Sequence, residues 1–456
     1  MRLSTFNRII RTLDESLRAL GGDPQPRELE FIAILVYEAM ASETREFHDV
    51  DHVFDVAGDG HPVEMLAAMF HDVVYFGVDR GFPPRQHPIV SEFVTERGGV
   101  LTLRPAAEMS ERIVRLTLEI FGFEAGGRLD PHCGQNEVLS ALVAARVLSP
   151  IISEEAFVQV AAGIEATIPF RGPDEDGVSC TDRLARRLRA TCARHGIGLR
   201  EDQITRAVQM AVLVANRDVG GFASESTAEF LVGTWELYTE NNPQLRFEGL
   251  YTIGDYRGSL EKTERFLHGL TPEHIFRSHE GVPNAPELQR ITERARHNLE
   301  VSVAYLRIKL FAAAYLEALA EASGGDAPLA LFMGDIRRRN EDVIRMEDHL
   351  TPPERRAVRR KSRNDNSEVY QLLVQGRARA SSFDTNHSPL SAFLVERLGE
   401  DEILRRFPVA TDLFEGRLAA EEFLHAQEPD VVSIIAGACA KVAMTRRKEL
   451  MSFVQS

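Results

Sequence analysis

The sequence has little of what would cross-link a chain covalently or carry it through a lipid bilayer. Its 456 residues include four cysteines, none in Cys-x-x-Cys spacing: Cys133, Cys180, Cys192 and Cys439. We expect reduced thiols rather than a disulfide framework, as in a cytoplasmic protein. No stretch approaches the roughly 20 apolar residues that span a bilayer, and the N-terminal residues lack the continuous apolar core of a signal peptide. We therefore expect a cytoplasmic protein without membrane contact.

Positive charge is also scarce. The 53 Lys and Arg residues are outnumbered by 69 Asp and Glu residues, which gives a formal net charge of −16. Because the phosphates of nucleic acids and anionic membranes would repel such a chain, we do not expect nucleic acid as a partner. The basic run RRAVRRKSR at 355–363 lacks interleaved aromatic residues, and we interpret it as a solvated helix face. A small anionic substrate stays compatible, since a bound divalent cation inverts the local field.

Alternating Val, Ile and Thr runs are scarce too, whereas helical periodicity extends along nearly the whole chain. We therefore predict an all-α fold. Apolar stripes in the longest helical segment indicate core packing or a homodimer contact. The predicted helices cover residues 26–41, 62–75, 136–148, 154–167, 179–195, 201–216, 226–239, 286–322 and 328–349.

Two histidine-containing stretches, REFHDVDHVFDV and EMLAAMFHDVVYFG, carry the chemistry. His48 and His52 are four residues apart, a spacing that would place them on one face of a helix. His71 and Asp72 end an apolar helical run, so both side chains can turn into a cavity between helices. An unpaired charge there would be costly. Ligands that converge from facing helices are what a metal in a helical bundle requires.

A fourth ligand is expected from a later helix. Asp218 in QMAVLVANRDVGGF is the best candidate, because an apolar run ends there in a carboxylate beside a glycine pair. The predicted set is His52, His71, Asp72 and Asp218. It suits a divalent cation without distinguishing Mn²⁺, Mg²⁺, Ni²⁺, Fe²⁺ or Zn²⁺. Since a buried histidine is more often a satisfied core residue than a ligand, the prediction depends on the order of all four residues.

The order FHDVDH, then FHDVVY, then a distant Asp resembles HD-superfamily domains. The similarity is to bacterial predicted metal-dependent HD phosphohydrolases and, more distantly, to class I cyclic-nucleotide phosphodiesterases, whose pattern is Tyr-His-Asn-x-x-His, His-Asp and a distant Asp. The resemblance covers about residues 30–260 and implies an HD-type helical bundle. It implies the same four metal ligands, with His48 as the proton donor to the leaving oxygen. Asp72 would be the bridging carboxylate if a second metal is present.

Three further residues are predicted around this site. The stretch GQNEVLSALVA resembles the Asn-Glu-x-x-Ser-Ala element of the bacterial group and contains Glu137. Glu137 and Glu165 could be outer carboxylates that hold a ligand histidine. Arg171 in IEATIPFRG could bind the phosphate of a substrate, because arginine recognises phosphate bidentately. The alternative for IEATIPFRG is an ordinary helix end with a surface arginine.

The expected function is a metal-dependent phosphohydrolase that cleaves a phosphate ester or nucleotide by metal-activated water. Two alternatives stay open. One is a nucleotide- or metal-binding regulatory protein with little or no turnover. The other is an HD-fold di-iron oxygenase, which would need two of His87, His132 and His195 near the metal, although their sequence contexts favour surface positions.

Composition predicts three regions. Residues 1–260 are expected to form the metal-binding helical domain, with an insertion at about 77–134 that lies over the site rather than in the core. Residues 261–380 would form a helical extension with the long helix. Residues 381–456 would form a small C-terminal helical module.

Overall fold

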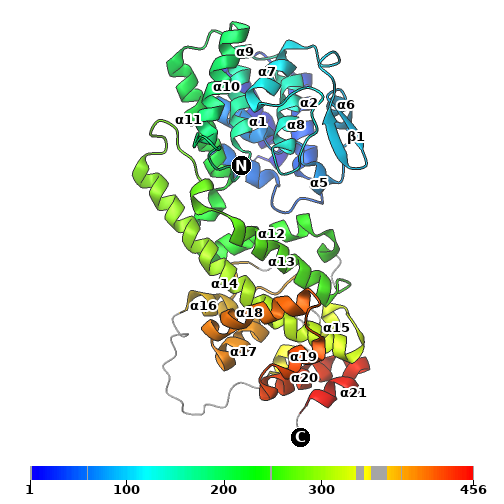
Figure 1. Cartoon of the computed structure of the whole chain (residues 1–456). Helices are drawn as coiled ribbons and strands as arrows, with labels where there is room; N and C mark the ends of the chain where they lie inside the picture. The colour runs from blue at the N-terminus through cyan, green and yellow to red at the C-terminus, as the bar shows by residue number, and fades with distance from the viewer. Residues whose placement is uncertain are drawn as a thin grey trace. The chain divides into compact units, whose positions relative to one another are not determined.

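The computed structural model describes residues 3–58, 60–246, 249–334, 344–350, 367–379, 381 and 383–454. It is 67% helix and 3% strand, so the predicted all-α class is confirmed (Figure 1). Within the described residues, the strands form one antiparallel ribbon of β1 (Val94–Arg97) and β2 (Val100–Leu103). None of the described helices is long and apolar enough to cross a membrane. The basic run at 355–363 lies outside the described residues.

The chain forms two compact units, and neither is continuous in sequence. Unit 1 comprises Met1–Ala223 and Thr271–Ala295, and unit 2 comprises Ser224–Leu270 and Arg296–Ser456. This division does not follow the boundaries expected near residues 260 and 380. Shifts in composition mark segments along the chain, whereas compact units are defined by which segments pack together.

The helices that lie wholly in unit 1 precede residue 224, apart from a short 3-10 helix, η3 (Pro272–His274). They are α1 (Thr5–Ala19), α2 (Pro26–Met40), α3 (Val50–Ala57), α4 (Pro62–Phe70), α5 (Phe76–Asp79), α6 (His87–Val90), α7 (Arg112–Phe121), α8 (Gln135–Leu148), α9 (Glu154–Ala166), α10 (Cys180–His195), α11 (Glu201–Asp218) and η1 (Gly220–Ala223).

The long helix α14 (Ala285–Gly324) contributes its first residues to unit 1 and the rest to unit 2. The other described helices of unit 2 are α12 (Thr227–Asn241), η2 (Pro243–Arg246), α13 (Ile253–Gly269), α15 (Leu329–Met333), η4 (Met346–His349), α16 (Glu368–Gln375), α17 (Pro389–Leu398), α18 (Glu400–Phe414), α19 (Ala420–His425), α20 (Pro429–Val442), η6 (Met444–Arg446), α21 (Arg447–Leu450) and η7 (Met451–Phe453).

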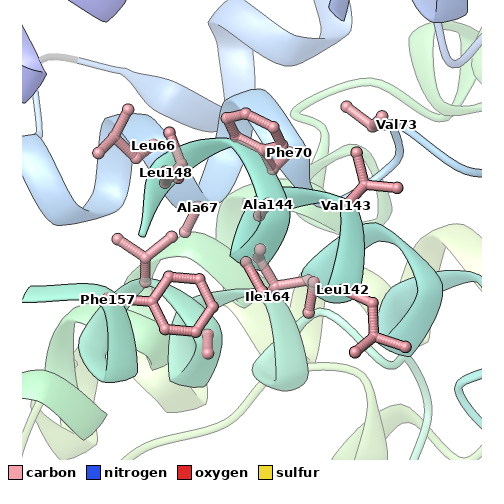
Figure 2. Packing of buried hydrophobic residues seen from close by; sticks show 14 of the residues in the cluster. Leu66, Ala67, Phe70, Val73, Leu142, Val143, Ala144, Leu148, Phe157 and Ile164 are labelled. Atoms are coloured by element: carbon pink, nitrogen blue, oxygen red, sulfur yellow. The ribbon is translucent and has the colours of Figure 1, made fainter. Parts of the chain in front are cut away.

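The core of unit 1 forms where α4, α8 and α9 pack together (Figure 2). Leu66, Phe70, Leu142, Phe157 and Ile164 are completely buried in it. Full burial of one such side chain stabilises a fold by about 1.5–3 kcal/mol. These helices therefore form a rigid support from which the turn after α4 projects.

A glycine allows α4 and α9 to approach closely. A Cβ atom at Gly163 on α9 would lie 2.6 Å from the Cβ of Ala67 on α4. Since real Cβ atoms do not come so close, any larger residue would push the two helices apart. The small pair Gly163 and Ala67 therefore sets the spacing of the helices below the turn.

The segment expected to be an insertion outside the core is part of the core. Ile89, Phe93, Leu101, Leu116 and Leu129 are buried and belong to the same hydrophobic cluster as α4, α8 and α9. The prediction that residues 77–134 lie over the site rather than in the core is wrong. The glycines and prolines of this segment mark tight turns between short elements, and those elements still bury their apolar faces.

Candidate metal centre

Four side chains from three parts of unit 1 converge on one point. His52 lies on α3, His71 and Asp72 lie in the turn after α4, and Asp218 is the last residue of α11. One ligand atom from each lies within 4.8 Å of the other three. The structure thus brings together the four residues predicted from the sequence, and this group could hold a metal ion.

The distances within the group are short. The Nε2 atom of His71 lies 3.0 Å from Oδ2 of Asp72 and 3.3 Å from Oδ1 of Asp218. The Nε2 atom of His52 lies 3.2 Å from Oδ1 of Asp218 and 3.9 Å from Oδ2 of Asp72. All four side chains are at most 16% exposed. Two nitrogens and two carboxylate oxygens therefore surround one small volume, as ligands of a divalent cation do.

The hydrogen bonding of His71 indicates which kind of ligand fits between the four side chains. Its Nδ1 atom lies 2.8 Å from the backbone oxygen of Ala68, so Nδ1 donates a proton. Its Nε2 atom is buried and makes no hydrogen bond with the described residues. In the neutral ring, Nε2 would direct a lone pair at the carboxylates of Asp72 and Asp218. A cation between them would turn this repulsion into coordination, so the residues fit a metal ion.

The pKa values of these residues also indicate that a positive charge is favoured among them. Burial disfavours a charged His71, but Asp72 and Asp218 outweigh burial and raise its pKa well above the ordinary value. Burial also opposes the two carboxylates, yet the charge of His71 lowers the pKa of Asp72 and brings that of Asp218 to about 2. Both carboxylates are therefore ionised at neutral pH, which is the form that binds a cation.

Arg45 holds the backbone at the His71-Asp72 turn, and sequence reasoning missed it. Its Nη1 atom donates to the backbone oxygen of Asp72 at 2.7 Å. The same guanidinium pairs with Asp79 at the end of α5, at 2.6 and 3.0 Å, and both side chains are almost fully buried. An isolated Arg three residues before His48 gives no signal of this role, because its partners lie 27 and 34 residues away.

The Asn-Glu-x-x-Ser-Ala element, on α8, hydrogen-bonds to the backbone just after the turn. The hydroxyl of Ser140 accepts a hydrogen bond from the backbone N–H of Val74 at 3.0 Å. The side-chain oxygen of Asn136 accepts one from Phe76 at 3.3 Å. These contacts also explain why α4 ends at Phe70, short of the predicted end at residue 75, since the N–H groups beyond it bond to α8 rather than to a further helical turn.

The end of α11 is fixed on two sides, which positions Asp218. The side chain of Asn216 pairs with both backbone groups of Arg277, at 2.8 and 2.9 Å. Arg217 donates to the backbone oxygen of Val56 and to a carboxylate oxygen of Glu64, each at 2.6 Å. Arg217 is therefore a structural tie from α11 to α3 and α4, and not merely the solvated neighbour of a ligand.

His48 lies near the site, but not on the helix on which we expected it. It lies in the irregular segment before α3, so the prediction that His48 and His52 share a helical face is wrong. The helix begins only at Val50, because the side chain of Asp49 caps it by accepting from the N–H of His52 at 3.0 Å. The Nε2 atom of His48 nevertheless lies 4.0 Å from Oδ2 of Asp72.

Glu165 has partners other than a ligand histidine. It is fully buried and binds Arg171 at 2.6 Å and Arg187 at 2.5 Å. His71 is held instead by the backbone oxygen of Ala68. Glu165 therefore orients two arginines, whereas the sequence predicted that it would hold a ligand histidine. Arg171 is only partly exposed, and its Nη1 and Nη2 atoms are directed at Glu165.

Glu137 borders the site electrostatically. Burial raises its pKa, and the charges of Asp72 and Asp218 raise it further, to about 7, although the charge of Arg171 opposes the shift. A carboxyl group that titrates near neutrality beside two ionised carboxylates responds strongly to any cation bound there.

The three histidines of the di-iron alternative do not join the site. His87 and His132 are exposed, as their sequence contexts predicted. His195 is half-buried and pairs with Glu119 at 3.1 Å. The metal-binding group found among the described residues contains none of them.

Comparison with known proteins adds no assignment. No family model matches the chain, and no curated protein or solved structure shows significant similarity to it. Any functional argument therefore depends on the geometry of the four residues and on their order in the sequence.

Proposed function

We propose that the chain is a metal-dependent phosphohydrolase of the HD type that acts on a phosphate ester or a nucleotide. One observation carries the proposal: two histidines and two aspartates converge, with Nε2 of His71 buried and directed at both carboxylates. The order of these residues along the chain is the order that resembles HD domains. Geometry and motif order are independent observations, and they agree on the same four positions.

A divalent cation at this site would polarise a phosphoryl oxygen and lower the pKa of water to near neutrality. The protein supplies the remaining parts. Asp72 and Asp218 are held ionised, and Arg45 and Ser140 fix the turn that carries Asp72. His48 lies next to Asp72, where its ring can hold a proton for the leaving oxygen of a substrate.

Arg171 is the residue that we assign to the phosphate of the substrate. The charges of Arg171, Asp72 and Asp218 all act on the pKa of Glu137, which supports a place for the guanidinium near the site. Glu165 restrains it in one orientation. A restrained guanidinium binds phosphate with less loss of side-chain entropy than a free one.

The test is phosphate release from a panel of nucleotides and generic phosphate esters with Mn²⁺, Mg²⁺ or Ni²⁺. We expect turnover with at least one metal, and its loss in His71→Ala and Asp72→Ala. His132→Ala is the matched control, because His132 is exposed and outside the group, and it should keep full activity.

Two other outcomes would replace this proposal. Tight nucleotide binding without turnover would identify a regulatory binding protein. Two irons per chain by elemental analysis would favour the oxygenase alternative, whereas one metal per chain would exclude it.

A further inference from the structure

A cavity lies in unit 2, apart from the four residues of the candidate metal centre. Its volume is about 60 Å³. Since a water molecule needs roughly 10–15 Å³ by the same measure, the cavity has room for a few waters or a ligand of a few heavy atoms. One part of its wall is apolar and includes Ala312, Ala313 and Leu390. Another part is polar and includes Lys309 and Asp384.

Asp384 is at the centre of a buried polar network. Three donors are directed at its Oδ2 atom: Nζ of Lys309 at 2.8 Å, Nε1 of Trp235 at 2.9 Å and Nη1 of Arg377 at 3.4 Å. Among the described residues, its Oδ1 atom accepts no hydrogen bond. One carboxylate oxygen thus serves three donors, two of which are cationic.

The charges of this network do not balance. The side chains of Lys309, Arg377 and Asp384 are 5%, 0% and 10% exposed. Burial opposes ionisation of Asp384, but the two cations outweigh it and lower its pKa, so Asp384 is charged. Among the described residues, two buried cations therefore share one carboxylate, which leaves an excess of one positive charge. An uncompensated buried charge is costly, and a bound anion would remove that cost.

Among the described residues that line the cavity, the other acidic groups do not supply the missing negative charge. Burial raises the pKa of Tyr256 well above its ordinary value, so its phenol stays neutral. Glu347 lies 3.5 Å from Arg345, and both line the cavity, so the charge of Glu347 is offset by that arginine. Within the part of the chain that the structure describes, the excess positive charge stays with Lys309 and Arg377.

Lys309 can present a donor to a ligand. An ammonium group has three N–H donors. Among the described residues, its hydrogen bonds go to Asp384 at 2.8 Å and to the hydroxyl of Ser388 at 3.0 Å. One N–H is therefore left without a hydrogen bond at a residue that lines the cavity, although Nζ also lies 5.6 to 5.8 Å from the ring centroids of Trp235, Tyr256 and Tyr305.

We propose that this cavity binds a small organic monoanion, a carboxylate with a short aliphatic chain. The carboxylate would be held by Lys309 and Ser388, and the aliphatic chain would lie against Ala312, Ala313 and Leu390. The volume limits the ligand to a few heavy atoms, the excess charge sets its sign, and the apolar wall distinguishes it from an inorganic anion.

The only tryptophan of the chain makes the proposal measurable. Trp235 donates to the same carboxylate oxygen as Lys309, so an anion bound at Lys309 should change its fluorescence. The full-length protein is titrated with acetate, propionate and butyrate at constant ionic strength, with inorganic phosphate and chloride in parallel. We expect a saturable change with at least one of the carboxylates and none with chloride.

Two variants test the site by different means. Lys309→Met removes the excess charge, and Ala313→Leu fills the cavity while it leaves every charge in place. Each should weaken carboxylate binding at least tenfold. Lys441→Met is the matched control, because Lys441 is exposed and does not line the cavity, and it should bind as the wild type does.

Circular dichroism establishes which variants are folded. If Lys309→Met does not fold, Ala313→Leu alone decides the test. A response that never saturates, or carboxylate binding unchanged in Ala313→Leu, would overturn the proposal. Tighter binding of phosphate than of any carboxylate would also overturn it, since the cavity would then be a site for inorganic anions.

Discussion

The buried charges of the two units are unbalanced in opposite directions. In unit 1, Asp72 and Asp218 are both ionised, and a protonated His71 offsets only one of their two negative charges. In unit 2, Lys309 and Arg377 share the single carboxylate of Asp384. A bound cation would balance the first group, and a bound anion would balance the second. The sign of an uncompensated buried charge thus indicates the sign of the ligand before its identity is known.

A third charged group in the molecule shows what a purely structural arrangement looks like. Arg45 and Asp79 pair one to one through two hydrogen bonds and are almost fully buried. No charge is left over, and the guanidinium also supports the backbone of Asp72. A balanced pair of this kind ties segments together and requires no ligand.

The largest expected effect on ligand binding concerns the negative group of unit 1. Asp218→Asn removes one of the two carboxylates, and we expect metal affinity to fall at least roughly a hundredfold, the upper end of what losing an outer partner costs. Competition with a chelating dye measures this. Asp51→Asn is the control, because Asp51 is 82% exposed and lies on the same helix as His52. Equal metal affinity in both variants would mean that the four residues are not a metal site.

The sequence could predict the four residues of this group because each lies at the end or on the face of an apolar helical segment. His71 and Asp72 follow a buried run on α4, and Asp218 ends a buried run on α11. Periodicity identifies such positions from neighbours close in the chain. It also identified α8, α9 and α10 to within about two residues at each end.

What the sequence could not show were pairings between distant segments. Arg45 contacts Asp72 and Asp79 across 27 and 34 residues, and Lys309 contacts Asp384 across 75. Periodicity indicates which face of a helix is buried but not against what. For the same reason the division into two units was missed, because it depends on residues 271–295 returning to unit 1.

The second prediction compares a balanced with an unbalanced group. Arg45→Met leaves the buried Asp79 without its cationic partner, with only the hydroxyl of Thr44 at 3.3 Å, and should reduce the free energy of unfolding of unit 1 by about 3–5 kcal/mol. Lys309→Met leaves Asp384 paired with Arg377, so in anion-free buffer it should cost unit 2 less than half as much. Hydrogen exchange of α3 to α5 reports on unit 1, and Trp235 fluorescence reports on unit 2. Equal costs would show that the excess charge of unit 2 is compensated in some other way.

The third prediction uses the pH dependence of Glu137. Its pKa in the folded protein is about 7, above the ordinary value of 4.5. Because the protonated form is favoured, the contribution of Glu137 to the stability of the metal-free protein should be complete below pH 4.5 and be lost as the pH rises through 7. Glu137→Gln should remove this contribution, which amounts to about 3 kcal/mol at 1.36 kcal/mol per pKa unit, whereas the raised pKa of His71 keeps a pH dependence above pH 6.5.

Denaturant unfolding of chelator-treated protein between pH 4.5 and pH 8 measures this slope. Glu155→Gln is the control, because Glu155 is an exposed carboxylate of α9, and it should keep the wild-type profile. Metal should flatten the wild-type profile as well, since a cation near Asp72 and Asp218 lowers the pKa of Glu137. If the decrease in stability between pH 4.5 and pH 6.5 survives in Glu137→Gln, the titration belongs to another group.

The smallest expected effect concerns the hydrogen bond that holds the turn after α4 in unit 1. Ser140→Ala removes the acceptor for the N–H of Val74 and should cost about 1 kcal/mol of stability. Because Val74 follows Asp72 by two residues, metal affinity should also fall, by about tenfold or less. Ser149→Ala, at the other end of α8, should change neither quantity. If Ser140→Ala lowers stability without changing metal affinity, the hydrogen bond supports the fold but does not position Asp72, and the rigidity of the negative group would then be due to Arg45.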